Sequence, residues 1–90
     1  MLPLNDFFLL SEQFLLFLFQ TLAELKAKRL ALAAAQGVPA FVVFSDATLI
    51  DMVNKKPQTR TDFAQINGVG PKKLAQYSDV FLALLTASQN

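Results

Sequence analysis

The sequence contains no cysteine and no histidine. The absence of thiols removes any disulfide framework and any thiolate metal site, and the absence of imidazole removes the usual zinc and nucleophile–base arrangements. Carboxylates do not replace them, because Asp46, Asp51 and Asp62 are spread along the chain, whereas a two-metal nuclease centre needs several converging acids. The composition therefore predicts a protein that is not an enzyme and that uses no cofactor or metal.

An apolar run long enough to span a bilayer is also lacking. The N-terminal segment is rich in Leu and Phe, but Ser11, Glu12 and Gln13 interrupt it, and no basic residue precedes it. No cleavage site with small residues follows it either. We therefore expect a cytoplasmic chain that does not enter a membrane, with an interfacial anchor as the alternative.

The chain is small, apolar and unevenly charged. Its 90 residues suffice for one domain, and nine Phe supply large side chains for a core without disulfides. All eight basic residues lie between Lys26 and Lys73, where three acidic residues oppose them, so this segment carries +5 while the whole chain carries +1. A basic segment of this kind suits an anionic partner.

The apolar pattern predicts a long first helix. Apolar residues recur at helical spacing from about Phe14 to Gln36, and Gly37 followed by Pro39 supplies the stop. The next segment, residues 38–44, is apolar and β-branched enough for a strand but has no partner run elsewhere. We therefore expect it to be a short connector packed on the core.

Capping residues predict the remaining helices. Ser45 can cap a second helix that ends before Pro57. Thr59 with Asp62 three residues later resembles a capping box that opens a short third helix. Because Pro71 fits the first position of a last helix, the predicted fold class is all-α, a compact bundle of four to five helices.

The turn INGVGPKKLAQY is the clearest candidate binding site. Gly68, Val69 and Gly70 lead into the last helix, whose free backbone N–H groups can hold a phosphate, as in a helix-hairpin-helix element. Lys72 and Lys73 would add positive charge. The alternative is that the glycines only permit a tight turn and the lysines are solvated, because GxG alone is a weak signal.

Several of these elements together resemble one known family. LAELKAKRLALAA on the first helix, VPAFVVFSDATLIDM and INGVGPKKLAQY are similar, in this order, to the HRDC domain of bacterial RecQ-type DNA helicases. The resemblance implies an HRDC-like domain over residues 18–90, with residues 1–17 as an apolar extension continuous with the first helix. It also implies a helical accessory domain that binds DNA or RNA, often single-stranded and weakly, without chemistry of its own.

The resemblance draws attention to Phe41, where bacterial helicase members usually carry Tyr. Phe41 follows Pro39 in the connector, so its ring can stack on an unpaired base. The alternative is a core position, because Val42, Val43 and another Phe follow directly.

Lys55, Lys56 and Arg60 surround the break between the second and third helices. If they face the same side as Lys72, they extend a basic track along a nucleic-acid backbone. The alternative is that they are solvated, since cations are favourable at a helix C-terminus in any case.

Arg29 falls on the apolar stripe of the first helix, four residues after Leu25. A guanidinium in such a place needs a carboxylate partner to offset its desolvation. The family resemblance suggests Asp46 as that partner.

Two functions of different classes follow. The first is a non-catalytic accessory domain of a RecQ-type helicase, bacterial and nucleoid-associated, that binds single-stranded or partly duplex DNA weakly through its phosphates and serves DNA repair and recombination. The second is a protein–protein interaction or dimerisation module. Phe14, Leu16 and Phe17 exceed what one bundle can bury, so the helicase core domains or a second copy would cover them.

Overall fold

A computed structural model describes residues 4–87 of the chain, with side chains from Glu12 onward, so residues 1–3 of the expected extension lie outside it. Every regular element in this range is a helix. The elements are α1 (Leu4–Gln36), α2 (Ala40–Val43), α3 (Asp46–Lys55), α4 (Arg60–Ala64) and α5 (Pro71–Ala87). The prediction of an all-α bundle of four to five helices is confirmed.

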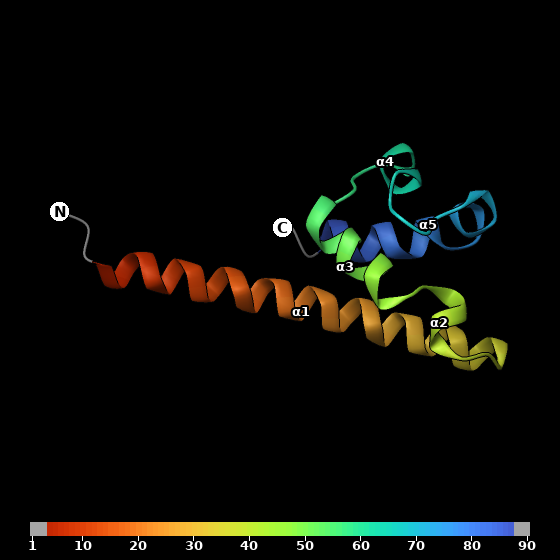
Figure 1. Cartoon of the computed structure of the whole chain (residues 1–90), viewed down its shortest axis with the longest axis horizontal. Coiled ribbons are helices and arrows are strands. Elements are labelled where there is room, and N and C mark those ends of the chain that lie inside the picture. The colour runs from red at the N-terminus through yellow and green to blue at the C-terminus, as the bar shows by residue number, and fades with distance from the viewer. Residues whose placement is uncertain (1–3, 88–90) are drawn as a thin grey trace.

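The long helix α1 is the axis of the molecule. Its 33 residues extend about 50 Å at 1.5 Å per residue. The other helices gather over its C-terminal half, and its N-terminal half continues beyond them (Figure 1). The predicted end at Gln36 is correct, but the helix begins at Leu4 instead of near Phe14, and it passes residues 17 and 18 without a break.

The segment predicted to be a connector contains the one-turn helix α2. Pro39 precedes α2 with an extended backbone, and the N–H of Phe44 donates to the carbonyl of Ala40 at 3.4 Å. The two sides of this turn differ in exposure, because Phe41 and Val42 are exposed while Val43 and Phe44 are buried. The segment is therefore a helical turn packed on the core, and it does not form a strand.

The predicted caps form, with one change in the second. Ser45 Oγ accepts from the N–H of Thr48 at 3.2 Å, and Thr59 Oγ1 accepts from the N–H of Asp62 at 3.1 Å. In a regular capping box the Asp62 carboxylate would accept from Thr59, but here it accepts from the N–H of Gln58 at 3.1 Å. The Asp62 carboxylate therefore holds the backbone of Gln58, the residue before the cap.

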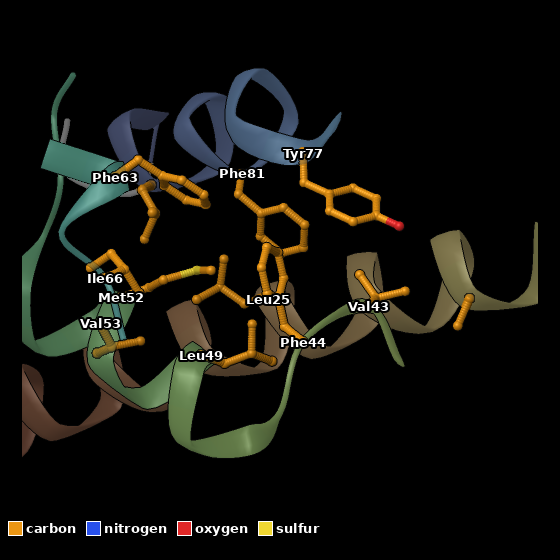
Figure 2. Close-up of a cluster of buried hydrophobic side chains, with 12 residues drawn as sticks. Leu25, Val43, Phe44, Leu49, Met52, Val53, Phe63, Ile66, Tyr77 and Phe81 are labelled. Atoms are coloured by element: carbon orange, nitrogen blue, oxygen red, sulfur yellow. The ribbon is translucent and has the colours of Figure 1, made fainter. Parts of the chain in front are cut away.

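The core is organised around the ring of Phe44, which α2 delivers to the centre of the bundle (Figure 2). Its centroid lies 6.3 Å from Phe63 of α4, 5.4 Å from Tyr77 and 5.1 Å from Phe81 of α5, each edge to face. Leu25 brings α1 into the same cluster and is fully buried. Because Phe44 contacts rings from two helices, it ties together parts of the chain that are far apart in sequence.

The pair predicted between α1 and α3 is present. Arg29 Nη1 lies 2.8 Å from Asp46 Oδ1 and also donates to the carbonyl of Phe44 at 3.0 Å. The hydrogen bond from Arg29, followed by the charge of that guanidinium, holds the pKa of Asp46 below its ordinary value of 3.8. Arg29 is thus a structural residue that fixes the start of α3 on α1.

Candidate nucleic-acid interface

One face of α3 fixes the chain that leads into the glycine turn. Asp51 Oδ2 accepts from the N–H of Asn67 at 2.9 Å, and Lys55 Nζ lies 3.0 Å from the same oxygen. Lys55 also donates to the carbonyl of Gln65 at 3.4 Å. The hydrogen bond from Asn67, and after it that from Lys55, lowers the pKa of Asp51. The position of the turn is therefore set by α3.

Gly68 is required by the packing of the turn. Its φ is +89°, a left-handed conformation that side chains disfavour, and a Cβ there would collide with Thr48 Oγ1. That hydroxyl is buried and lies 3.0 Å from Ser45 Oγ, so it has little freedom to move away. The packing of the tight turn alone therefore explains why a glycine is present at position 68.

Gly70 stands in a different environment. Its φ is not positive, and a Cβ added to it would meet nothing within 4 Å. Its carbonyl accepts from the N–H of Leu74 at 2.9 Å, which makes Gly70 the residue directly before α5. The N–H groups of Lys72 and Lys73 are in the first turn, where a helix offers them no internal acceptor. An anion can approach this helix end over Gly70.

Val69, the middle residue of the turn, faces the protein. Its side chain is half-buried and packs against the core, and its N–H donates to the carbonyl of Ile66 at 3.1 Å. Val69 therefore shapes the turn, and its amide is already bonded.

The two lysines of the turn are not equivalent. Lys72 is exposed, whereas Lys73 is half-buried and its Nζ lies 5.5 Å from the centroid of the Phe44 ring. A cation over an aromatic face at this distance is attracted to the ring. The exposed Lys72 can therefore bind a phosphate, whereas the ammonium group of Lys73 is held near the core by its contact with the Phe44 ring.

Phe41 is the most exposed large apolar side chain of the segment that holds it, at 70%. It lies one turn before Phe44, whose ring is in contact with Lys73 of α5. Phe44 therefore connects α2 with the first turn of α5 on the buried side of α2, whereas Phe41 is on the exposed side. The core alternative for Phe41 does not hold in this structure.

The three remaining basic candidates have different surroundings. Lys55 contacts the segment before the turn, as described above. Lys56 takes a left-handed conformation at the end of α3, and its Nζ lies 5.6 Å from the centroid of the Phe14 ring of α1. Arg60 is exposed at the first position of α4. Of these, Lys55 is the one whose contacts connect it with the turn.

Sequence reasoning missed Thr48 and Asp51 as the residues that build the turn. In the sequence both look like ordinary helix residues, because their partners Gly68 and Asn67 are distant along the chain. The available signal was that they lie three residues apart on one face of α3. That spacing alone does not say what the face contacts.

The described part of the chain shows neither a metal site nor a membrane span. Among the side chains of residues 12–87, no three acidic, His or Cys side chains are placed to hold a metal ion. No helix in the same range has the length and apolar character needed to cross a bilayer.

Fold and site together define the class of protein: a small helical domain whose candidate functional feature is a turn between two helices. The family model of the HRDC domain matches residues 19–85, so the chain belongs to the HRDC domain family. HRDC domains are non-catalytic accessory domains of helicases, and this domain is not itself an enzyme.

Similar proteins include two kinds of DNA helicase. The ATP-dependent DNA helicase RecQ of Bacillus subtilis is 46% identical over 63 residues, which are 70% of this chain and 11% of the helicase. The ATP-dependent DNA helicase UvrD2 of Mycobacterium tuberculosis is 41% identical over 66 residues, 73% of this chain and 9% of that protein. This chain therefore spans about a tenth of the length of these relatives.

A solved structure has the same fold. The D. radiodurans RecQ HRDC domain 3 matches with a TM-score of 0.74 and 28% sequence identity, over 78% of this chain and 92% of that one. The expected resemblance to HRDC domains of RecQ helicases is thereby confirmed.

Proposed function

We propose that this domain binds DNA, single-stranded or partly duplex, as an accessory domain of a bacterial RecQ-type helicase acting on the nucleoid. Family membership supports the helicase context, because relatives at 46% and 41% identity are named as DNA helicases. The observation that carries the proposal is the open N-terminal end of α5, where Gly70 leaves space and Lys72 is exposed.

The chemistry of this helix end suits a phosphate. First-turn N–H groups and the positive end of the helix dipole attract an anion, and the missing Cβ of Gly70 allows close approach. Lys72 supplies a charge that no core contact constrains. Phosphate contacts of this kind carry no sequence information, so binding should be indifferent to base sequence.

Phe41 offers a second contact for an unpaired base. An exposed ring on the same domain as a phosphate site suits single-stranded nucleic acid, since its unpaired bases are free to stack. Replacing such a ring by alanine typically costs about 1–3 kcal/mol of binding per stacked base. Phe41 would therefore distinguish single strands from duplex.

The test is fluorescence anisotropy of a labelled single-stranded oligonucleotide at two salt concentrations, with the parent domain, Lys72→Ala and Phe41→Ala. We expect weak binding that falls with salt. Lys72→Ala should weaken it and flatten the slope of log K against log salt by about 0.7, the value for one phosphate contact on a single strand. Phe41→Ala should weaken single-strand binding while changing the salt slope little.

Lys28→Ala is the matched control, because it removes the same charge from α1, a different element from the turn. If Lys28→Ala weakens binding as much as Lys72→Ala, the attraction is diffuse and the α5 site is wrong. If the parent does not bind at low salt, the DNA-binding proposal fails altogether.

A second function, docking to another protein surface through α1, is favoured by a separate observation. Phe14 is 53% exposed, Leu16 is 60% exposed and Phe19 is 68% exposed. Phe17, expected to join this surface, is half-buried instead. Contiguous apolar exposure of this kind marks an interaction surface in a soluble domain.

A further inference from the structure

Residues 12–26 of α1 present an apolar stripe with one charge at each end. We define the α1 stripe as the exposed residues that follow one another at helical spacing along this face: Glu12, Leu15, Leu16, Phe19, Ala23 and Lys26. The first four line a common hollow on the surface. The stripe thus runs from an acidic residue, through bulky apolar residues, to a basic residue.

An apolar groove continues the stripe toward α3. Leu15, Leu18, Phe19 and Leu22 of α1 line one side of the groove, and Ile50 and Val53 of α3 line the other. Phe19 and Ile50 are 68% and 47% exposed. The same surface therefore carries the exposed ring of Phe19 and an apolar groove, both of which a docking partner can contact.

We propose that the α1 stripe is the interface of a two-fold dimer, in which α1 of a second copy packs antiparallel against it with Phe19 at the axis. The proposal deepens the docking function proposed above by naming its occupant and its register. An isologous interface requires a surface that is complementary to itself under a two-fold rotation. The α1 stripe meets that requirement in its charges, and Leu22 of the adjoining groove completes it for the apolar residues.

Charge complementarity selects the antiparallel arrangement. With the axis at Phe19, Glu12 lies opposite Lys26 of the second copy, and the symmetry repeats this pair at the other end. A parallel arrangement in register would instead place Glu12 beside Glu12 and Lys26 beside Lys26. Like charges at such distances destabilise a helix pair, whereas opposite charges support it and set its orientation.

In the same register, the apolar residues between the two charged pairs pack against one another. Residues equidistant from Phe19 face each other, which brings Leu16 opposite Leu22 and Leu15 opposite Ala23. Moving the axis toward Leu16 would put Glu12 opposite Ala23, and moving it toward Ala23 would put Lys26 opposite Leu16. Only the register centred on Phe19 pairs both charges while large residues face smaller or similar ones.

Lys26 keeps its charge available for this contact. It is exposed, and its neighbour Asp46 is already bonded by Arg29 at 2.8 Å. The ammonium contributes to the lowered pKa of Asp46 through charge alone, without a hydrogen bond of its own. A carboxylate from a second copy can therefore approach it.

The two proposals rest on different residues. The α1 stripe consists of residues of α1 between positions 12 and 26, whereas the candidate DNA site is formed by Gly70, Lys72 and Phe41, which belong to other segments. Either proposal can therefore fail without the other.

The first measurement is sedimentation equilibrium without DNA, comparing the parent with Phe19→Glu and Phe41→Glu. The two phenylalanines are 68% and 70% exposed, so each charge can be tolerated by the fold, which circular dichroism should verify. We expect a parent dimer that Phe19→Glu weakens by roughly 100-fold or more, because a carboxylate at the axis would be buried beside its own copy. Phe41→Glu should leave the dimer unchanged.

Charge reversal tests the register. Glu12→Lys alone and Lys26→Glu alone should each weaken the dimer, by roughly tenfold for two exposed pairs turned repulsive. The double variant Glu12→Lys/Lys26→Glu should restore it, and an equal mixture of the two single variants should form a heterodimer. A parallel dimer in register would show no such loss and rescue.

Three outcomes overturn the proposal. A parent that is monomeric at its highest soluble concentration leaves the α1 stripe to a different protein domain. A dimer that survives Phe19→Glu uses another surface. A dimer lost in Phe19→Glu but indifferent to both charge reversals refutes the antiparallel register.

Discussion

At the residue scale, Gly68 and Gly70 have different structural roles, although they are only two positions apart and look alike in the sequence. Gly68 is fixed by its left-handed backbone and by the hydroxyl of Thr48, whereas Gly70 faces open space. The sequence predicted a glycine turn and left open whether it served packing or binding. The structure assigns the packing requirement to Gly68, which leaves Gly70 as the position where a small residue is not needed for the fold.

This contrast gives a prediction for stability. Gly68→Ala should lower the free energy of unfolding by about 1–3 kcal/mol, because it combines backbone strain with a collision. Gly70→Ala should change it by less than about 0.5 kcal/mol, as exposed substitutions usually do. Thermal denaturation of both variants measures the difference, and equal stabilities would refute the distinct roles.

Capping and pairing residues were well predicted at this scale. The Ser45 and Thr59 caps and the Arg29–Asp46 pair all depend on short spacings or on a family pattern, and all three are present. The contacts of Thr48 and Asp51 were not predicted, because their partners are brought near only by the path of the folded chain.

At the element scale, α3 does more than fill the core. One of its faces buries Leu49 and Met52, and another carries Asp51 and Lys55 to the segment before the turn. Its apolar face was predictable from helical spacing. Its second face was not, because a carboxylate that accepts a backbone N–H looks like a solvated residue in sequence. The one-turn helix α2 was also missed, since four residues give too short a pattern to identify a helix.

The Asp51 contact predicts a dependence of stability on acid. The pKa of Asp51 is lowered in the folded state, by the N–H of Asn67 first and Lys55 next, so its stabilising contribution is complete above the ordinary value of 3.8. That contribution is lost as the pH falls through the lower, folded-state pKa. Asp51→Asn should therefore show a smaller drop in Tm between neutral pH and pH values below 3.8 than the parent.

Asp46→Asn should act in the same direction, because Arg29 lowers the pKa of Asp46 as well. Scanning calorimetry across this pH range measures both variants against the parent. An unchanged acid-induced drop in Asp51→Asn would show that the Asn67 contact does not persist in solution.

At the scale of the whole molecule, Phe44 joins the N-terminal and C-terminal parts of the chain. Its ring contacts α4 and α5, and its carbonyl is held by Arg29 of α1. The helical periodicity predicted the bundle and its buried faces. It did not predict which residue would be central, because centrality depends on how the helices are arranged in space.

Truncation of this ring should be the most damaging change in the core. Phe44→Ala should cost about 3–5 kcal/mol, a large part of the roughly 5–15 kcal/mol that typically stabilises a domain. Urea denaturation would measure it, with Phe41→Ala as the control because that ring, one turn away, is 70% exposed. Similar losses for the two variants would contradict the central position of Phe44.

The two halves of α1 also differ in the free energy that is needed to open their backbone hydrogen bonds. Around Leu25 and Ala33 the helix is covered by the bundle, so its amides should exchange with deuterium only when the domain unfolds. Around Leu16 and Phe19 the side chains are open to solvent, and local fraying suffices. A single continuous helix therefore carries a boundary between slow and fast exchange, and a surface that covers the α1 stripe would move this boundary without altering the fold.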